Sequence, residues 1–211
     1  MIVADSTQKL IEAVEKADSA EGLLDAVEAL SAARDEAAIP TLIEVLRFNN
    51  PGAAVAAVEG LIDLQEVAVP HLLQQIDDYN YGARAWAIRA LAGIGDPAAL
   101  DILLKAASTD FSLSVRRAAA RGLGNIRWLL LDSQKAFLAQ SEVLDTLLLV
   151  CQDGEWVVRY AAVVGLESLA NTFADSRFDL MDKILQQCQE MLQGDPELVV
   201  RARIKMALEQ L

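Results

Sequence analysis

The sequence is short of the residues on which most catalytic sites depend. Its 211 residues include one histidine, His71, and two cysteines, Cys151 and Cys188. A histidine-based catalytic triad and a transition-metal site of Cys and His ligands therefore cannot be assembled, and we expect no metal. The two cysteines lie far apart, each within a helical pattern, which predicts packed, reduced thiols and a cytoplasmic protein.

Long apolar runs and leader-like segments are also missing. No stretch of about 18 uncharged apolar residues occurs, so we expect no membrane span. The first residues lack a basic region followed by an apolar run, so we expect no signal peptide. The motifs GxGxxG, GxxxxGK[ST], GxSxG and HExxH are absent, which excludes the common nucleotide-binding, serine-nucleophile and zinc-peptidase classes.

Basic residues are few, and their distribution is uneven. There are 18 Lys and Arg against 31 Asp and Glu, a net charge of −13, which argues against nucleic acid as a partner. Residues 78–130 nevertheless hold seven basic and four acidic residues, between two acidic segments. A locally positive middle favours a small anionic ligand or an acidic patch on a partner. Chance clustering of solvated charges is the alternative.

The residues that are present indicate an all-helical chain with internal repeats. Apolar residues make up 54% of the composition, much of it Ala and Leu, and there are only five prolines. Leucines that follow Ala or Gly recur at spacings of 31, 30, 32, 43 and 42 residues, at Leu30, Leu61, Leu91, Leu123, Leu166 and Leu208. In four units an Asp-x5-Arg pattern stands in register: Asp78/Arg84, Asp110/Arg116, Asp153/Arg159 and Asp195/Arg201.

Each unit reads as an apolar first helix, a short acidic turn and an Ala-rich second helix. One such pair cannot bury its apolar face alone, whereas stacked pairs can, so we predict an α-solenoid of about six helical hairpins. We expect a single domain over 1–211, with an N-terminal cap repeat at 1–36, repeats two to four at 37–128, and an insertion with the C-terminal repeats at 129–211. Residues 128–140 insert about a dozen residues, which predicts an extended helix or an extra turn.

The Asp in the turn and the Val-Arg at the start of the second helix resemble HEAT repeats. The resemblance implies that Asp and Arg pair between turn and helix and between neighbouring units. We therefore interpret Arg84, Arg116, Arg159 and Arg201 as structural residues and leave them out of the predicted ligand site.

Helical periodicity separates core positions from exposed positions in the second helices. Trp86 and Arg89 lie away from the apolar face of their helix, and Arg117 and Arg121 are i,i+4 neighbours on one face of the next. Arg89 and Arg121 share one repeat column. Because second helices usually line the concave side of a solenoid, we expect a positive cluster of these arginines in a groove.

Aromatic residues gather in and beside the same units. Aromatics next to Arg suit a flat, conjugated ligand that bears carboxylates, since the rings can stack and the guanidinium can pair with the acids. The alternative is that aromatics near the turns fill the core. The predicted ligand-binding residues are Tyr79, Tyr81, Trp86, Arg89, Arg117, Arg121, Trp128, Trp156 and Tyr160.

Two blocks carry a more specific resemblance. YNYGARAWAIRALAGIGDP (79–97) and DFSLSVRRAAARGLGNIRW (110–128) resemble the phycobilin lyases of the E/F type, and the length and repeat count resemble their F-type subunits. The resemblance implies an enzyme that acts with an E-type partner. It attaches phycocyanobilin, an open-chain tetrapyrrole, through a thioether to a cysteine of the phycocyanin α subunit. Phycocyanobilin is then a substrate, and no cofactor is permanently bound.

The resemblance also bears on mechanism. Such lyases hold the bilin in a productive conformation for the acceptor thiol, and an acidic group could hydrogen-bond the pyrrole nitrogens; Asp110 and Glu155 are candidates. The Asn-His-Cys motif that accompanies bilin isomerisation in a related F-type subunit is absent, so we predict attachment without isomerisation. Two alternatives stay open: a non-enzymatic HEAT adaptor that binds phycobiliproteins, and a lyase for another bilin such as phycoerythrobilin.

Overall fold

The computed structural model describes residues 2–76, 80–173 and 177–211. Within these ranges the chain forms α-helices, short 3-10 turns and no strand. The α-helices are α1 Ile2–Glu15, α2 Ala20–Ala32, α3 Ile39–Val45, α4 Pro51–Asp63, α5 Val69–Gln74, α6 Tyr81–Ile94, α7 Leu100–Thr109, α8 Leu113–Leu123, α9 Ser133–Val150, α10 Trp156–Ala170, α11 Phe178–Gly194 and α12 Leu198–Leu208. The 3-10 turns are η1 Glu36–Ala38, η2 Gln65–Ala68, η3 Pro97–Ala99 and η4 Trp128–Leu130.

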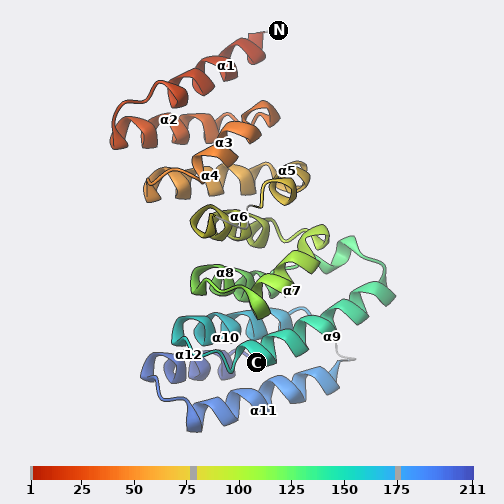
Figure 1. Ribbon diagram of the computed structural model, residues 1–211. Coiled ribbons are helices and arrows are strands. Elements are labelled where there is room, and N and C mark those ends of the chain that lie inside the picture. The colour runs from red at the N-terminus through yellow and green to blue at the C-terminus, as the bar shows by residue number, and fades with distance from the viewer. Residues whose placement is uncertain (1, 77–79, 174–176) are drawn as a thin grey trace. The chain divides into compact units, whose positions relative to one another are not determined.

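The helices pair into six successive hairpins, from α1–α2 to α11–α12, which confirms the predicted α-solenoid (Figure 1). Short-range sequence signals set where several helices begin. Prolines occupy the first turn of α3, α4 and α5, where a missing N–H costs nothing. Side-chain oxygens of Asn50 and Asp132 accept hydrogen bonds from the first backbone N–H groups of α4 and α9.

The chain divides into two compact units, Met1–Ile94 and Gly95–Leu211, and each is described here by itself. In the first unit the second helices α2, α4 and α6 pack in sequence, with α3 against α4 and α5 against α6. In the second unit α8, α10 and α12 pack in the same way, with α7, α9 and α11 beside them. The core of each consists of Ala, Leu, Val and Ile, and small Ala residues on the second helices let neighbouring helices approach closely.

The Asp and Arg of the repeats form a ladder in the second unit, as the HEAT resemblance implies. The guanidinium of Arg116 donates to both carboxylate oxygens of Asp153, at 2.7 and 3.1 Å, and to the backbone carbonyl of its own Asp110 at 2.9 Å. Arg159 repeats the arrangement with Asp195, at 2.7 and 3.0 Å, and with the carbonyl of Asp153. Each Arg therefore closes its own turn through a carbonyl and joins the next repeat through a carboxylate.

The ladder lowers the pKa of its carboxyl groups. Burial acts to raise the pKa of Asp153 and of Asp195, but hydrogen bonds from Arg116 and Arg159 and from backbone N–H groups outweigh it. The net pKa of both groups lies below the ordinary Asp value. Asp78 lies outside the described residues, so the ladder is described for the second unit alone.

Two glycines set the separation of α8 and α10. A Cβ at Gly165 would overlap the backbone carbonyl of Ala120, and a Cβ at Gly124 would overlap the carbonyl of Gly165. The two helices therefore meet backbone to backbone at these points. Any larger residue at either position forces the two repeats apart.

The insertion at 128–140 forms η4 and the first two turns of α9. This makes α9, with 18 residues, an extended helix, as predicted. Among the helices of the described ranges, none is both long enough and apolar enough to cross a membrane.

Candidate functional site

A cavity of about 460 Å³ lies among the second helices of the second unit. Arg121 reaches it from α8, Tyr160, Val164 and Glu167 from α10, and Arg203 and Met206 from α12. The cavity therefore combines an aromatic ring and apolar side chains with charges of both signs. Two of the predicted ligand-binding residues, Arg121 and Tyr160, meet here.

Arg121 is a cation without a local partner. In the described parts of the chain, neither Arg121 nor its i+4 neighbour Arg117 makes an ion pair or a hydrogen bond through its side chain, and both are exposed. Like charges at this spacing repel each other by a few tenths of a kcal/mol. An anion bound beside them would relieve that repulsion, so the arrangement is suited to a carboxylate ligand.

Glu167 and Arg203 form an ion pair in the cavity wall. Their side chains are only 16% and 11% exposed, so the pair is held in a largely dry environment. The pair links α10 to α12 and also presents charged atoms to the cavity. Neither residue was among the predicted ligand-binding residues. The sequence does hold one signal for Glu167. When the repeats are aligned on their leucines, Glu167 of the fifth unit stands where the fourth unit has Gly124, so a charged residue replaces a small one.

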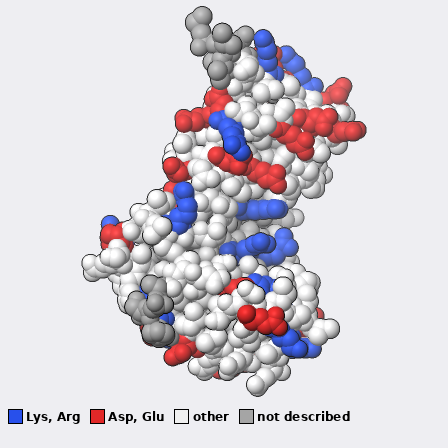
Figure 2. Space-filling view, turned by 180° about the vertical axis from the view of Figure 1, so that it is seen from behind, with Lys and Arg blue, Asp and Glu red and all other residues white. Residues whose placement is uncertain are grey.

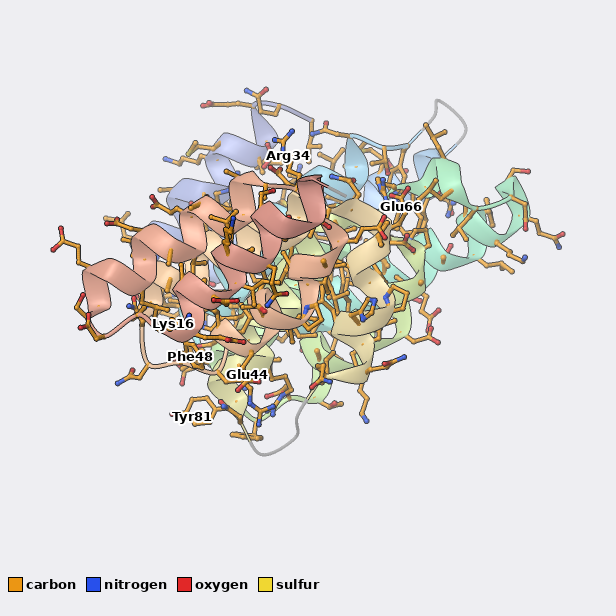
Figure 3. The ribbon with its side chains drawn as sticks, turned by 90° about the horizontal axis from the view of Figure 1, so that it is seen from above. Lys16, Arg34, Glu44, Phe48, Glu66 and Tyr81 are labelled. Carbon is orange, nitrogen blue, oxygen red and sulfur yellow. The ribbon has the colours of Figure 1, made fainter. Side chains whose placement is uncertain are left out.

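A second group of predicted residues lies in the first unit. Tyr81 and Trp86 of α6 line a cavity of about 320 Å³ together with Phe48 and Asn50 from the turn before α4. Figure 3 shows Phe48 and Tyr81 on the same side of this unit. The guanidinium of exposed Arg89 lies over the Trp86 ring at 5.4 Å from its centroid, a cation–π contact.

A third cavity, between α2 and α4, has the opposite electrostatic character. It measures about 460 Å³ and is lined by Glu28, Glu59 and Asp63, with Arg34 held by Asp63 at 2.8 Å. Figure 2 shows acidic side chains gathered on the N-terminal part of the molecule, at the top of the view. This cavity would repel a dicarboxylate, although it lies between second helices like the cavity of α8, α10 and α12.

The remaining predicted residues lie elsewhere. Trp128 is 8% exposed and packs into the core at η4, outside the lining of the cavities above, and its contact with a ligand stays a prediction. Trp156 is exposed at the first position of α10, outside the lining of the cavities above. Tyr79 lies outside the described residues. The predicted cluster of Arg89 with Arg117 and Arg121 joins residues of two units and stays a prediction.

The two candidate acids both belong to the turns. The Asp110 carboxylate accepts the Ser112 backbone N–H at 2.8 Å, and the Asp110 carbonyl accepts from Arg116. Glu155 precedes α10, is exposed and makes no side-chain cap hydrogen bond. Within the described residues, two acids line the cavity that holds Arg121 and Tyr160: Glu167, which pairs with Arg203, and exposed Glu209.

Both cysteines are buried, free thiols, as predicted. Burial raises the pKa of Cys188 to about 11, and it raises the pKa of Cys151 as well. Neither thiol is therefore ionised near neutral pH, and neither suits a role as a nucleophile.

The chain matches models of two repeat families. Residues 69–167 match HEAT repeats, and residues 24–48 match the PBS lyase HEAT-like repeat. The first match runs from α5 into α10, and the second runs from α2 through α3.

Relatives of known name match along almost the whole chain. It is 52% identical over 210 residues to the phycocyanin alpha phycocyanobilin lyase CpcF of Synechocystis sp., covering 100% of this chain and 96% of that protein. It is 53% identical over 204 residues to a phycocyanobilin lyase subunit beta of Nostoc sp., covering 97% of this chain and 100% of that protein.

A solved structure is also similar to this chain. The complex of CpcE and CpcF of phycocyanin lyase from Nostoc sp. contains a chain that matches with a TM-score of 0.77 at 55% identity, over 82% of this chain and 99% of that one. The protein therefore belongs to the family of the phycocyanobilin lyase beta subunits, the CpcF family of HEAT-repeat proteins.

Proposed function

We propose that this chain is the F-type subunit of a heterodimeric phycocyanobilin lyase. With an E-type subunit it attaches phycocyanobilin to a cysteine of the phycocyanin α subunit through a thioether, without isomerisation and in the cytoplasm. The observation that carries the proposal is the 52% identity, over the whole chain, to a protein named for this activity. Phycocyanobilin is the substrate and no resident cofactor is involved.

The chemistry requires positioning more than it requires a reactive side chain. Thiol addition to a carbon–carbon double bond forms one C–S bond and moves the thiol hydrogen to the neighbouring carbon, so no oxidant or leaving group is needed. Holding the two reactants in an attack geometry can supply several kcal/mol of the barrier. A chain with a single histidine and two buried thiols is compatible with such a role.

We place a carboxylate-bearing part of the bilin at the cavity among α8, α10 and α12. Arg121 would pair with a propionate, with Arg117 adding positive potential, while Tyr160 and Met206 contact the rings. Glu167 and Glu209 replace Asp110 and Glu155 as the candidate acids beside this ligand, because both line the cavity. Tyr81, Trp86 and Arg89 of the first unit form a second candidate surface for the pigment.

Reconstitution tests the activity. The chain is mixed with phycocyanobilin and apo-phycocyanin α subunit, with and without an E-type subunit, and the product is read by absorbance and by zinc fluorescence on a denaturing gel. We expect covalent pigment with native-like absorption only when both subunits are present. Pigment-independent binding to phycocyanin with no covalent product would favour the adaptor, and preferential attachment of another bilin would correct the substrate.

Variants test the site. Arg121→Ala should weaken bilin binding at least tenfold, because it removes an unpaired cation from the cavity. Lys183→Ala, which removes an exposed charge from α11, is the matched control and should bind normally. Equal binding by both variants would remove the cavity from the proposal while leaving the lyase assignment in place.

A further inference from the structure

The insertion at 128–140 exposes large apolar side chains. Leu129 is completely exposed, and Leu130, Phe137 and Leu138 are 57%, 51% and 63% exposed. These four residues, which we term the apolar platform, come from a stretch of ten residues on η4 and the first turns of α9. Apolar side chains gathered in this way on a protein surface mark an interaction site or an aggregation hazard.

The start of the platform is pinned to the fold. The backbone N–H of Arg127 donates to the Gly95 carbonyl at 2.8 Å, and the Arg127 guanidinium lies 3.7 Å from the Asp96 carboxylate. Trp128 is buried, and the Asp132 side chain caps α9 by accepting from the Lys135 N–H at 2.9 Å. Leu129 and Leu130 therefore lie between two segments that hydrogen bonds and burial hold in place. Their exposure follows from the conformation of this turn.

A buried arginine holds the other half of the platform. Arg177, 5% exposed, stacks on the Phe137 ring at 3.8 Å from its centroid and donates to Gln140 at 3.0 Å and Ser141 at 2.9 Å. Its Nε is buried without a hydrogen-bond partner, and the Asp179 carboxylate lies 3.9 Å away. Burying a guanidinium lowers the free energy of unfolding unless its contacts compensate for the lost hydration. The contacts of Arg177 with Phe137, Gln140 and Ser141 hold the first turns of α9 in place.

The exposed charged residues nearest to the platform along the chain, which we term its rim, are mostly acidic. Asp132 lies between Leu130 and Phe137 in sequence and pairs with Lys135 at 3.1 Å, Glu142 and Asp145 follow on α9, and Asp179 lies beside Arg177. A surface that fits this face must therefore combine apolar pockets with Lys or Arg at their edges. The insertion lies outside the repeat pattern, so stacking of repeats does not explain the apolar residues.

We propose that the platform is the docking surface for the E-type subunit, an inference that rests on the proposed function. Permanent interfaces are more hydrophobic than transient ones, and an acceptor that leaves after pigment attachment meets the chain only transiently. The matched Nostoc chain was solved in complex with CpcE, so a lasting partner of this kind exists in the family. The E-type subunit would present apolar pockets rimmed by basic residues to Leu129, Leu130 and Leu138.

The test measures the affinity of the full chain for an E-type subunit by titration calorimetry at low and moderate salt. Leu129→Ser/Leu138→Ser should weaken binding at least tenfold while the melting temperature stays within about 2 °C, because both side chains are exposed. Leu198→Ser, which changes a leucine that is 72% exposed at the start of α12, should bind like the unmodified chain. Raising the salt concentration should weaken binding of the unmodified chain, since the rim is charged.

The possible failures are distinguishable. If the unmodified chain does not bind the E-type subunit at all, the proposed heterodimer fails. If it binds and the double variant binds equally well, the platform is not the docking surface. If the double variant loses binding to apo-phycocyanin α or loses self-association while binding the E-type subunit normally, the occupant is the acceptor or a second copy, and the inference is overturned.

Discussion

At the scale of single residues, the arginines of the second unit divide by what their guanidinium groups contact. Arg116 and Arg159 are committed to carboxylates and carbonyls of the ladder, and Arg177 is buried under the platform. Arg117 and Arg121 have no such partners among the described residues. The same residue type therefore builds the fold in one column and is available to a ligand in another.

Replacing Arg177 tests whether its charge or its geometry matters. Arg177→Lys keeps the charge but loses the planar stacking on Phe137 and the fork to Gln140 and Ser141. We expect a loss of about 1–3 kcal/mol in unfolding free energy and faster amide hydrogen exchange over residues 133–141. Arg47→Lys, at a far more exposed site, is the control and should change neither quantity. Unchanged exchange in Arg177→Lys would show that the platform is fixed by other contacts.

The two thiols give a pH-dependent prediction. Because burial raises the pKa of Cys188 to about 11, its thiol stays neutral in the folded chain while an unfolded thiol ionises near pH 9. We expect negligible reaction with a thiol reagent at pH 8 in the native state and two reactive thiols after unfolding. Stability contributed by this group should be complete below about pH 9 and decline between about pH 9 and about 11. Rapid native labelling of both cysteines would contradict the burial.

At the scale of elements, the ladder should matter more than surface ion pairs. Arg159 and Asp195 are 11% and 3% exposed, and removing Arg159 takes the guanidinium donor away from Asp195 and from two turn carbonyls. Arg159→Ala should cost about 2–4 kcal/mol by urea unfolding. Arg34→Ala breaks a pair whose side chains are 69% and 47% exposed, so its cost should stay below about 1 kcal/mol. Equal losses of unfolding free energy in the two variants would mean that the ladder pair stabilises the fold no more than an exposed ion pair does.

The ladder also predicts a sensitivity to acid. The pKa values of Asp153 and Asp195 are lowered in the folded chain, so their contribution is present above the ordinary Asp pKa near 4 and is lost as the pH falls below it. Asp153→Asn/Asp195→Asn should be less stable at pH 7 and should show a shallower decline of stability between about pH 4 and pH 2. The measurement is the unfolding free energy from urea titrations across that range.

The elements were more predictable than the site, for a physical reason. Asp-x5-Arg in register and 3.6-residue periodicity are local signals, and they predicted the hairpins. The ladder was implied by the resemblance to HEAT repeats, and the extended α9 was one of two outcomes expected from the insertion. The pairing of Glu167 with Arg203 and the burial of Trp128 depend on how repeats pack across an insertion, which no fixed spacing encodes. Arg121 was predicted because it lies away from the apolar face of its helix and Tyr160 because it belongs to the group of aromatics, and both line one cavity.

At the scale of the whole molecule, stability should be distributed repeat by repeat. In a linear array each repeat contacts only its neighbours, so damage at an end stays near that end. Ile204 is fully buried in α12, so Ile204→Ala should leave a cavity and lower the unfolding free energy by about 2–5 kcal/mol. We expect faster hydrogen exchange, measured by mass spectrometry, in α11 and α12 and unchanged exchange in α2 and α4. A uniform loss of protection would show that the chain unfolds as one cooperative body.

The glycine contact between α8 and α10 has a consequence for how this family can vary. Arg121 and Tyr160 line one cavity from helices whose separation is set by Gly124 and Gly165. A single methyl group at either glycine would act as a spacer and change the distance between these two cavity-lining side chains while leaving both in place. The width of the cavity can therefore be changed by a substitution outside its lining, at the point where the two backbones lie closest.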